Sequence, residues 1–156
     1  MTRAVLVSGG QVDYVQNVSV GHHLFQADEP VNSGGLDAGP DPYELLLSAL
    51  GTCISITLRM YAERKRWPLE CVQVRLTYAK VHAEDCAACD GEARLTDGIE
   101  AEVLVVGDLS EDQHRRLLEI AGRCPVHRTL TSSIQIRTDL SAKEKGTQAC
   151  LQSTSS

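Results

Sequence analysis

The chain has 156 residues, of which 42% are hydrophobic and 23% charged, the proportions of an ordinary globular protein with one core. Its net charge of −6 argues against general nucleic-acid binding, because no basic stripe is available to neutralise phosphates. Residues 4–7 are too short an apolar run for a signal peptide, and we expect no segment to reach the length of a transmembrane helix.

The first forty residues predict β-strands followed by a loop. Residues 12–20 alternate imperfectly between apolar and polar side chains, and residues 22–27 predict another short strand. Residues 29–40 are rich in Gly and Pro, the residues that favour turns.

A long helix is predicted from Pro42 onward. Asp41 can cap it, and Glu44 stands three residues after the cap, as in a capping box. Trp67-Pro68 should stop the helix, because proline disfavours helical geometry in the residue before it.

Apolar residues recur along this helix at spacings of three and four, which predicts a buried face that includes Cys53. The members of this stripe are Leu46, Ala49, Cys53, Ile56 and Met60. Other apolar residues lie outside the stripe, at Leu45, Leu50, Ile54 and Leu58. A helix that is apolar nearly all round needs cover on several sides, so we expect a dimer that wraps around it.

Two strands and a second helix are predicted next. Residues 72–78 alternate clearly, and residues 99–105 place apolar side chains on one face. Ser110 and Gln113 form a second capping-box pattern, and the helix that follows should run up to Cys124.

Ile134 and Ile136 predict a last strand. The sequence then becomes polar and rich in Ser and Thr, so we expect residues 141–156 to be a disordered tail in which Cys150 is incidental. The order of elements predicts a single α+β domain over residues 1–140, with mostly antiparallel strands.

The six cysteines are expected to be thiols of a cytoplasmic protein, and thiols in a reducing compartment usually serve redox or metal chemistry. Cys53 and Cys124 lie in apolar helical patterns far apart in the sequence, which indicates a pair brought together by the fold. Cys71 begins a strand, and we interpret it as a packing residue.

Three motifs carry a resemblance to a known family. Residues 39–46 (GPDPYELL), 50–53 (LGTC) and 124–127 (CPVH) resemble the OsmC/Ohr family, and the similarity extends from the first strands to Ile136. The resemblance implies an intertwined homodimer, in which antiparallel sheets wrap around two central helices and the active sites lie at the subunit interface. From the net charge and the apolar segment lengths we expect no binding to nucleic acid or to a membrane.

The resemblance also implies a thiol peroxidase that reduces organic hydroperoxides in oxidative-stress defence. Cys53 would be the peroxidatic residue and Cys124 the resolving residue, with a dithiol reductant closing the cycle and no organic cofactor. One alternative is a non-catalytic member of the family that binds a small ligand in the dimer pocket.

The residues that activate the thiol in the best-studied branches, an arginine and a glutamate, are altered in this chain. Tyr43 directly follows Pro42, and Glu44 is one position late. One helical step rotates a side chain by about 100°, so Glu44 need not face Cys53. Gln11 stands near the position where the family often has its arginine.

Substitutes for these residues are present near the second cysteine. His127 can act as a base or cationic partner of Cys53, or it can form a structural hydrogen bond. Arg123 and Arg128 flank the same turn. Glu44 remains a candidate for activation as well as for capping.

A further cluster, Cys86 and Cys89 with His82 upstream, is a candidate zinc site, an exposed redox pair or an inert loop. A metal-binding module centred on this cluster is therefore a second alternative function. A complete zinc site needs a fourth ligand, and the candidates for it are Asp85, Asp90, His22 and His23.

Overall fold

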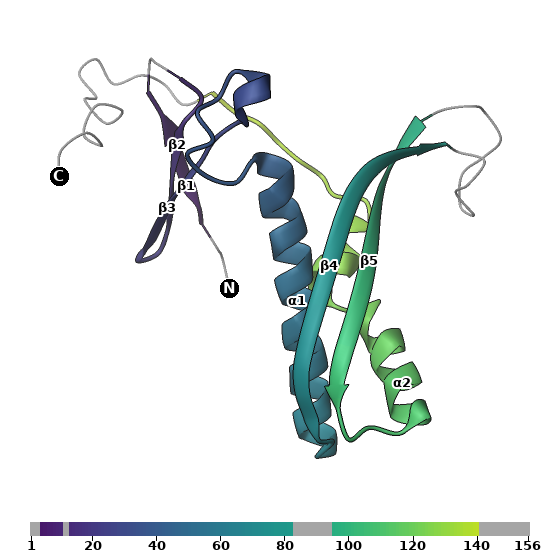
Figure 1. Ribbon diagram of the computed structural model, residues 1–156. Helices are drawn as coiled ribbons and strands as arrows, with labels where there is room; N and C mark the ends of the chain where they lie inside the picture. Colours follow the sequence, from purple (N-terminus) through teal and green to yellow (C-terminus); the bar gives the residue numbers. More distant parts are fainter. Residues whose placement is uncertain (1–3, 11–12, 83–94, 141–156) are drawn as a thin grey trace. The chain divides into compact units, whose positions relative to one another are not determined.

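The computed structural model describes residues 4–10, 13–82 and 95–140 (Figure 1). They divide into two compact units, one formed by residues up to 45 together with those from 136 onward, the other by residues 46–135. Each unit is described by itself below, and the single domain expected over residues 1–140 stays a prediction.

The first unit contains an antiparallel sheet of three strands in the order β1-β2-β3. The strands are β1 (Leu6–Gly9), β2 (Gln16–Val20) and β3 (His23–Ala27). Val18 in the central strand pairs with residues of both neighbours and is buried.

The strand expected over residues 22–27 is confirmed as β3, whereas the one expected over residues 12–20 is confirmed only in its second half. Asp13 has a φ of 65°, in the left-handed region, and this bend delays the start of β2. The sequence did not predict β1.

A buried carboxylate organises the loop between β3 and the long helix. Asp28 is only 3% exposed, and its two oxygens accept hydrogen bonds from the N–H groups of Glu29 (2.8 Å), Leu36 (2.8 Å) and Ala38 (3.2 Å). Burial alone would raise the pKa of Asp28, but these donors outweigh it and lower the pKa below its ordinary value. A short 3-10 helix, Val31–Ser33, lies inside this loop.

The long helix α1 (Pro42–Lys65) begins and ends as predicted. The N–H of Glu44 donates to Asp41 Oδ1 (2.8 Å), and the N–H of Asp41 donates to Glu44 Oε2 (2.9 Å), which is a complete capping box. Arg66, just past the last turn, has a φ of 56°, so the chain leaves the helix before Trp67.

The apolar stripe predicted for α1 is not the stripe that this chain buries. Ile56 and Met60 are 59% and 56% exposed, and Cys53 is half-buried. The buried residues are Leu50, Ile54, Leu58 and Ala62. Because α1 is apolar on most of its surface, its periodicity did not show which stripe its own chain would cover.

The expectation that no segment reaches transmembrane length is wrong for α1. By length and composition alone this helix could cross a membrane, with a mean hydropathy of 1.5 over its most apolar window. Core helices share this property, and Leu58 of α1 is completely buried in its own unit.

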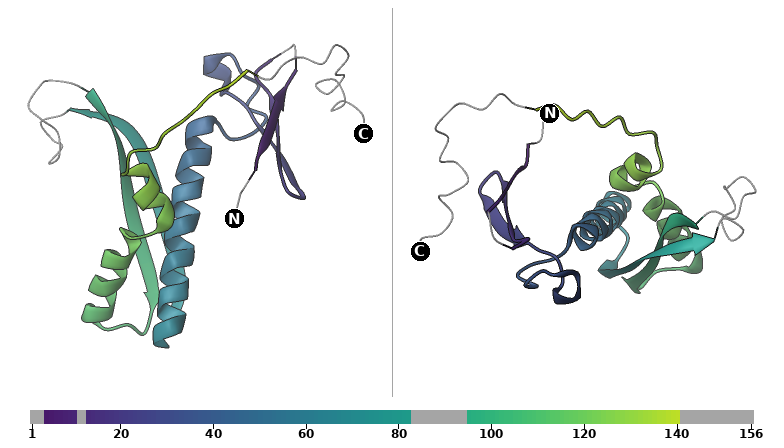
Figure 2. Two further views of the ribbon diagram at one scale, coloured as in Figure 1. Left: turned by 180° about the vertical axis from the view of Figure 1, so that it is seen from behind. Right: turned by 90° about the horizontal axis from the view of Figure 1, so that it is seen from above.

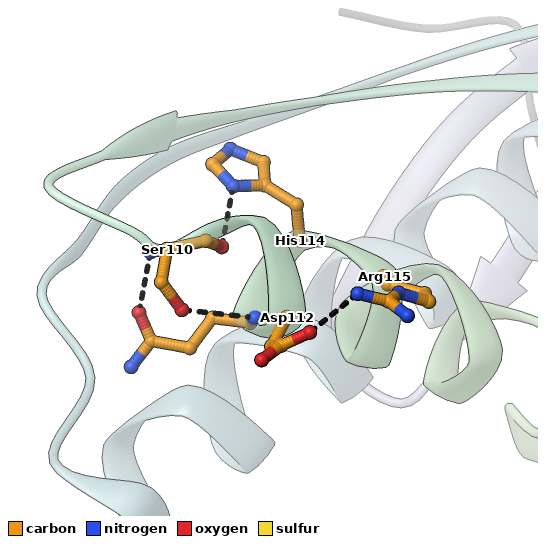
Figure 3. Close-up of polar contacts among 5 residues, drawn as sticks. Ser110, Asp112, His114 and Arg115 are labelled. Atoms are coloured by element: carbon orange, nitrogen blue, oxygen red, sulfur yellow. Dashed lines mark hydrogen bonds and ion pairs between the residues drawn. The ribbon is translucent and has the colours of Figure 1, made fainter.

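The second unit packs two helices on one face of a β-hairpin (Figures 1 and 2). The hairpin consists of β4 (Leu69–His82) and β5 (Leu95–Gly107), and it contains both strands predicted for this region. The core between the layers is formed by α1 and α2 (Glu111–Ala121) with inward-facing residues of the hairpin. Ser110 and Gln113 form the predicted capping box at the start of α2 (Figure 3).

Two expectations for the C-terminal part are wrong. The second helix ends at Ala121 rather than at Cys124, and a separate helix, α3 (Pro125–Leu130), follows it. Ile134 and Ile136 lie in no strand and are 52% and 85% exposed. Alternation predicts how side chains are disposed, but a strand also needs a hydrogen-bonded neighbour, and none pairs with these residues in the described part of the chain.

We expect Asp28→Asn to lower the Tm at neutral pH, because the amide cannot match the carboxylate as an acceptor for three N–H groups. The lowered pKa means that this stabilisation is present above the unfolded-state pKa, near 3.8, and is lost as the pH falls through the folded-state value. Thermal melts from pH 7 to pH 2.5 should show the difference between the two proteins shrinking at low pH. The exposed Asp108→Asn is the control, and a constant difference across this range would contradict the assignment.

Candidate dithiol site

The helix α1 presents Cys53 toward the first turn of α3. Its thiol is half-buried, and its Sγ accepts a hydrogen bond from the N–H of Val126 at 3.5 Å. Cys53 and Val126 both pack against the core of the second unit, so the sulfur lies in mostly apolar surroundings.

The second thiol, Cys124, serves as the N-cap of α3. Its backbone is extended (φ −63°, ψ 147°), and its Sγ accepts a hydrogen bond from the N–H of His127 at 3.3 Å. Pro125 occupies the first turn, where its missing N–H costs nothing. The thiol therefore takes the place that a serine or aspartate side chain usually has at a helix start, and it is fully buried.

The two thiols interact directly. Burial raises the pKa of Cys124, and the neighbouring thiol of Cys53 raises it further. The N–H groups of His127 and Val126 act in the opposite direction, because a hydrogen bond to the sulfur favours the thiolate. The pKa of Cys124 nevertheless lies above its ordinary value, so this thiol is protonated at neutral pH.

This arrangement is chemically suited to reversible disulfide formation. Both cysteines are free thiols, and they come from segments separated by about seventy residues. Access to the two sulfurs is unequal, because Cys53 is partly exposed and Cys124 is 0% exposed. A reagent from solution therefore reaches Cys53 first.

The structure commits Glu44 to the capping box of α1. Glu44 precedes Cys53 by nine positions. Nine steps of about 100° make about two and a half turns, so the two side chains lie on opposite sides of the helix. Tyr43 is 53% exposed, and Gln11 lies outside the described residues.

The three other activating candidates lie in α3 or just before it. Arg123 and Arg128 are exposed, and no ion pair of either guanidinium is found among the described residues. His127 is half-buried, and its Nδ1 is buried without a hydrogen-bond partner in the described part of the chain.

The candidate metal site cannot be assembled from the described residues. Cys86 and Cys89 lie outside them, as do Asp85, Asp90 and Cys150; His82 is the last residue of β4. His22 and His23 are exposed at the turn between β2 and β3, with ring centroids 3.9 Å apart. Within residues 4–10, 13–82 and 95–140, no group of three or more potential metal ligands occurs. Cys71 is exposed on β4, and therefore is not the packing residue that we expected.

The sequence interpretation missed the backbone donors of Val126 and His127. The signal was present, because proline directly after a potential cap is typical of a helix start. The apolar pattern before Cys124 instead predicts that the preceding helix reaches Cys124, which leaves no place for the turn that carries both N–H groups.

Comparison with known proteins finds one matching protein family and a set of solved structures with a similar fold. The model of the OsmC-like protein family matches residues 34–139. A search of curated protein sequences finds no match.

Three solved structures illustrate the similarity of fold. An OsmC-like protein from Mycoplasma pneumoniae is 20% identical, with a TM-score of 0.66 over 83% of this chain and 87% of that one. An organic hydroperoxide resistance protein OsmC from Legionella pneumophila is 19% identical (TM-score 0.61, 84% and 90% covered). The organic hydroperoxide resistance protein OhrB of Bacillus subtilis is 17% identical (TM-score 0.58, 84% and 91% covered). At these identities the likeness shows an α+β fold with antiparallel sheets and helices.

The raised pKa of Cys124 predicts a pH dependence of stability in the reduced protein. The unfolded chain releases this proton at a lower pH than the folded chain does, so the stabilisation is complete below the unfolded-state pKa, near 9, and is lost as the pH rises. We expect urea unfolding between pH 7 and pH 10, with reductant present, to show a weaker alkaline loss of stability in Cys124→Ala than in the wild type. Cys71→Ala, which removes an exposed thiol, should behave as the wild type does. Equal alkaline slopes for all three proteins would refute the shift.

Proposed function

The chain belongs to the OsmC-like protein family, and on this premise we propose that it is a cysteine-based peroxidase that reduces organic hydroperoxides. The observation that supports this most directly is the contact between Cys53 and Cys124, in which each sulfur also accepts a backbone N–H. Similar folds occur in proteins named for organic hydroperoxide resistance.

The proposed oxidation starts at Cys53. Its thiolate attacks the terminal oxygen of the hydroperoxide, the O–O bond breaks, and the products are a sulfenic acid on Cys53 and an alkoxide that takes up a proton to become an alcohol. The thiol of Cys124 then attacks the sulfenic sulfur and expels water, which leaves a Cys53–Cys124 disulfide. Two electrons have passed from the dithiol to the peroxide.

The unequal environments of the sulfurs support this assignment of roles. The attacking species must be a thiolate that the peroxide can reach, and Cys124 is both protonated at neutral pH and fully buried. Cys53 is partly exposed and receives the N–H of Val126. The apolar residues around it favour a hydrophobic hydroperoxide over the strongly hydrated hydrogen peroxide.

A dithiol reductant would close the cycle. One of its thiolates attacks the accessible sulfur of Cys53 and releases Cys124, and its second thiol then displaces Cys53 and leaves the reductant as a disulfide. Regeneration of this kind needs a reducing compartment, and we propose that the protein works in the cytoplasm.

The exposed stripe of α1 supports a homodimer. Ile56 and Met60 leave more than half of their surface uncovered in the single chain, although α1 is apolar on these sides too. Contiguous apolar surface of this kind is typical of an interface. A second copy covering the stripe would also enclose the neighbourhood of Cys53, which lies on the same helix.

Peroxidase activity should depend on both thiols in different ways. In stopped-flow assays with cumene hydroperoxide, we expect Cys53→Ser to abolish consumption. Cys124→Ser should retain a single turnover, because the sulfenic acid forms but cannot be resolved. Peptide mass spectrometry of the oxidised wild type should find the Cys53–Cys124 linkage.

Cys71→Ser is the matched control, since it removes an exposed thiol that the mechanism does not use. Wild-type consumption that survives in Cys53→Ser, or a wild type that consumes no hydroperoxide, would refute the proposed activity.

The dimer should depend on the exposed stripe. Met60→Glu places a charge where the second copy would pack, so sedimentation equilibrium should show a shift toward monomer. Leu118→Glu, on an exposed position of α2 (64% exposed), is the control and should remain dimeric. A monomeric wild type, or a Met60→Glu protein as dimeric as the control, would contradict the proposal.

A further inference from the structure

Two histidines stand in the first turns of successive helices, and their rings differ in one respect. His114 on α2 is exposed, and its Nδ1 pairs with the carbonyl of Ser110 at 3.0 Å (Figure 3). His127 on α3 has its Nδ1 buried, and in the described residues this atom has no hydrogen-bond partner. A buried polar atom without a partner destabilises a fold, and such atoms commonly mark a functional requirement.

The unpartnered nitrogen lies beside the two thiols. The backbone N of His127 is 3.3 Å from Cys124 Sγ, and the preceding residue, Val126, donates its N–H to Cys53 Sγ. The bonds between the backbone N and Nδ1 of one residue keep the two atoms close, so Nδ1 lies within about 8 Å of Cys124 Sγ. The same turn of α3 thus carries the unpartnered nitrogen and the backbone donors to both sulfurs.

The peroxidase reaction requires an acid at this place. When a thiolate attacks an alkyl hydroperoxide, the leaving group is an alkoxide, which is a strong base and departs slowly unless it is protonated. Arg123 and Arg128 are exposed, and Glu44 is held in its capping box. Among the candidate activating residues, His127 alone combines a titratable atom with a buried position next to the sulfurs.

We propose that His127 is a catalytic acid of this site, with Nδ1 as the atom that protonates the departing alkoxide; this rests on the peroxidase function proposed above. The partly exposed Cys53 thiol loses its proton to solvent, and His127 enters the step as an imidazolium. The thiolate attacks the terminal oxygen, the O–O bond breaks, and the Nδ1–H proton passes to the alkoxide oxygen. The products are the Cys53 sulfenic acid, the alcohol and neutral His127, so atoms and charge balance.

The dependence on the leaving group tests this role. A peroxy acid such as peracetic acid releases a carboxylate, a weak base that needs no protonation. We expect His127→Phe to lower kcat/KM with cumene hydroperoxide by about 10²-fold, in line with the loss of a general acid. With peracetic acid the same variant should react at nearly the wild-type rate. The Tm of reduced His127→Phe should be unchanged or higher, because the substitution removes an unpaired buried nitrogen.

Two further variants complete the experiment. His114→Phe makes the same chemical change at a histidine away from the thiols, and should leave both rates unchanged. His127→Asn keeps a polar nitrogen near the Nδ1 position without a titratable group. Its KM for cumene hydroperoxide should lie closer to the wild-type value than that of His127→Phe, while its kcat stays low. If His127→Phe does not fold, the kcat of His127→Asn with the two oxidants tests the proposal in its place.

An equal loss with both oxidants would overturn the proposal, because it would indicate a role in structure or thiol activation instead. Full activity of His127→Phe with cumene hydroperoxide would overturn it too. In both cases the peroxidase function would stand, since the wild type reacts. A wild type that consumes neither oxidant would refute both proposals together.

Discussion

The contact between the middle of α1 and the first turn of α3 is the interaction on which the site depends. It places the Cys53 sulfur against the N–H of Val126 and the Cys124 sulfur against the N–H of His127, so one turn of backbone supplies donors to both thiols. Packing of α1 and α2 against the β4–β5 hairpin forms the core of the same unit. The pair can form only while that core is folded, because about seventy residues separate the two cysteines in the sequence.

Local chemistry was readable from the sequence. The caps of α1 and α2 are encoded by residues three positions apart, Asp41 with Glu44 and Ser110 with Gln113, and both capping boxes form as predicted. The hairpin strands were also predicted, because residues 72–78 alternate clearly and residues 99–105 place apolar side chains on one face. The pairing of Cys53 with Cys124 was predicted from their shared apolar patterns and from the family resemblance, and the two thiols do lie together.

The features that the sequence did not reveal depend on which other helix or strand packs against a given segment. Ile56 and Leu58 are both apolar, yet only Leu58 is buried in this chain, because the hairpin covers one stripe of α1 and leaves the other open. Ile134 and Ile136 alternate as a strand would, but strand formation requires a neighbouring edge. The donors at Val126 and His127 are backbone N–H groups, which every residue except proline has, so their side chains do not mark them as donors. Only Pro125, which is typical of a helix start, could have indicated the turn that presents them.

The altered activating residues and the backbone donors are two sides of one physical problem. A thiol in an apolar environment resists ionisation, so a reactive thiolate needs charge or hydrogen bonds to balance burial. The family resemblance implies that a glutamate and an arginine provide this elsewhere, whereas here Glu44 lies on the opposite side of α1 from Cys53 and is occupied by the cap of the helix. Two amide donors stand at the sulfurs instead, and they stabilise negative charge without bringing a carboxylate near it. Amides cannot transfer a proton, however. A site built on them still needs a titratable group for the leaving alkoxide, and a buried imidazole on the same turn satisfies that requirement.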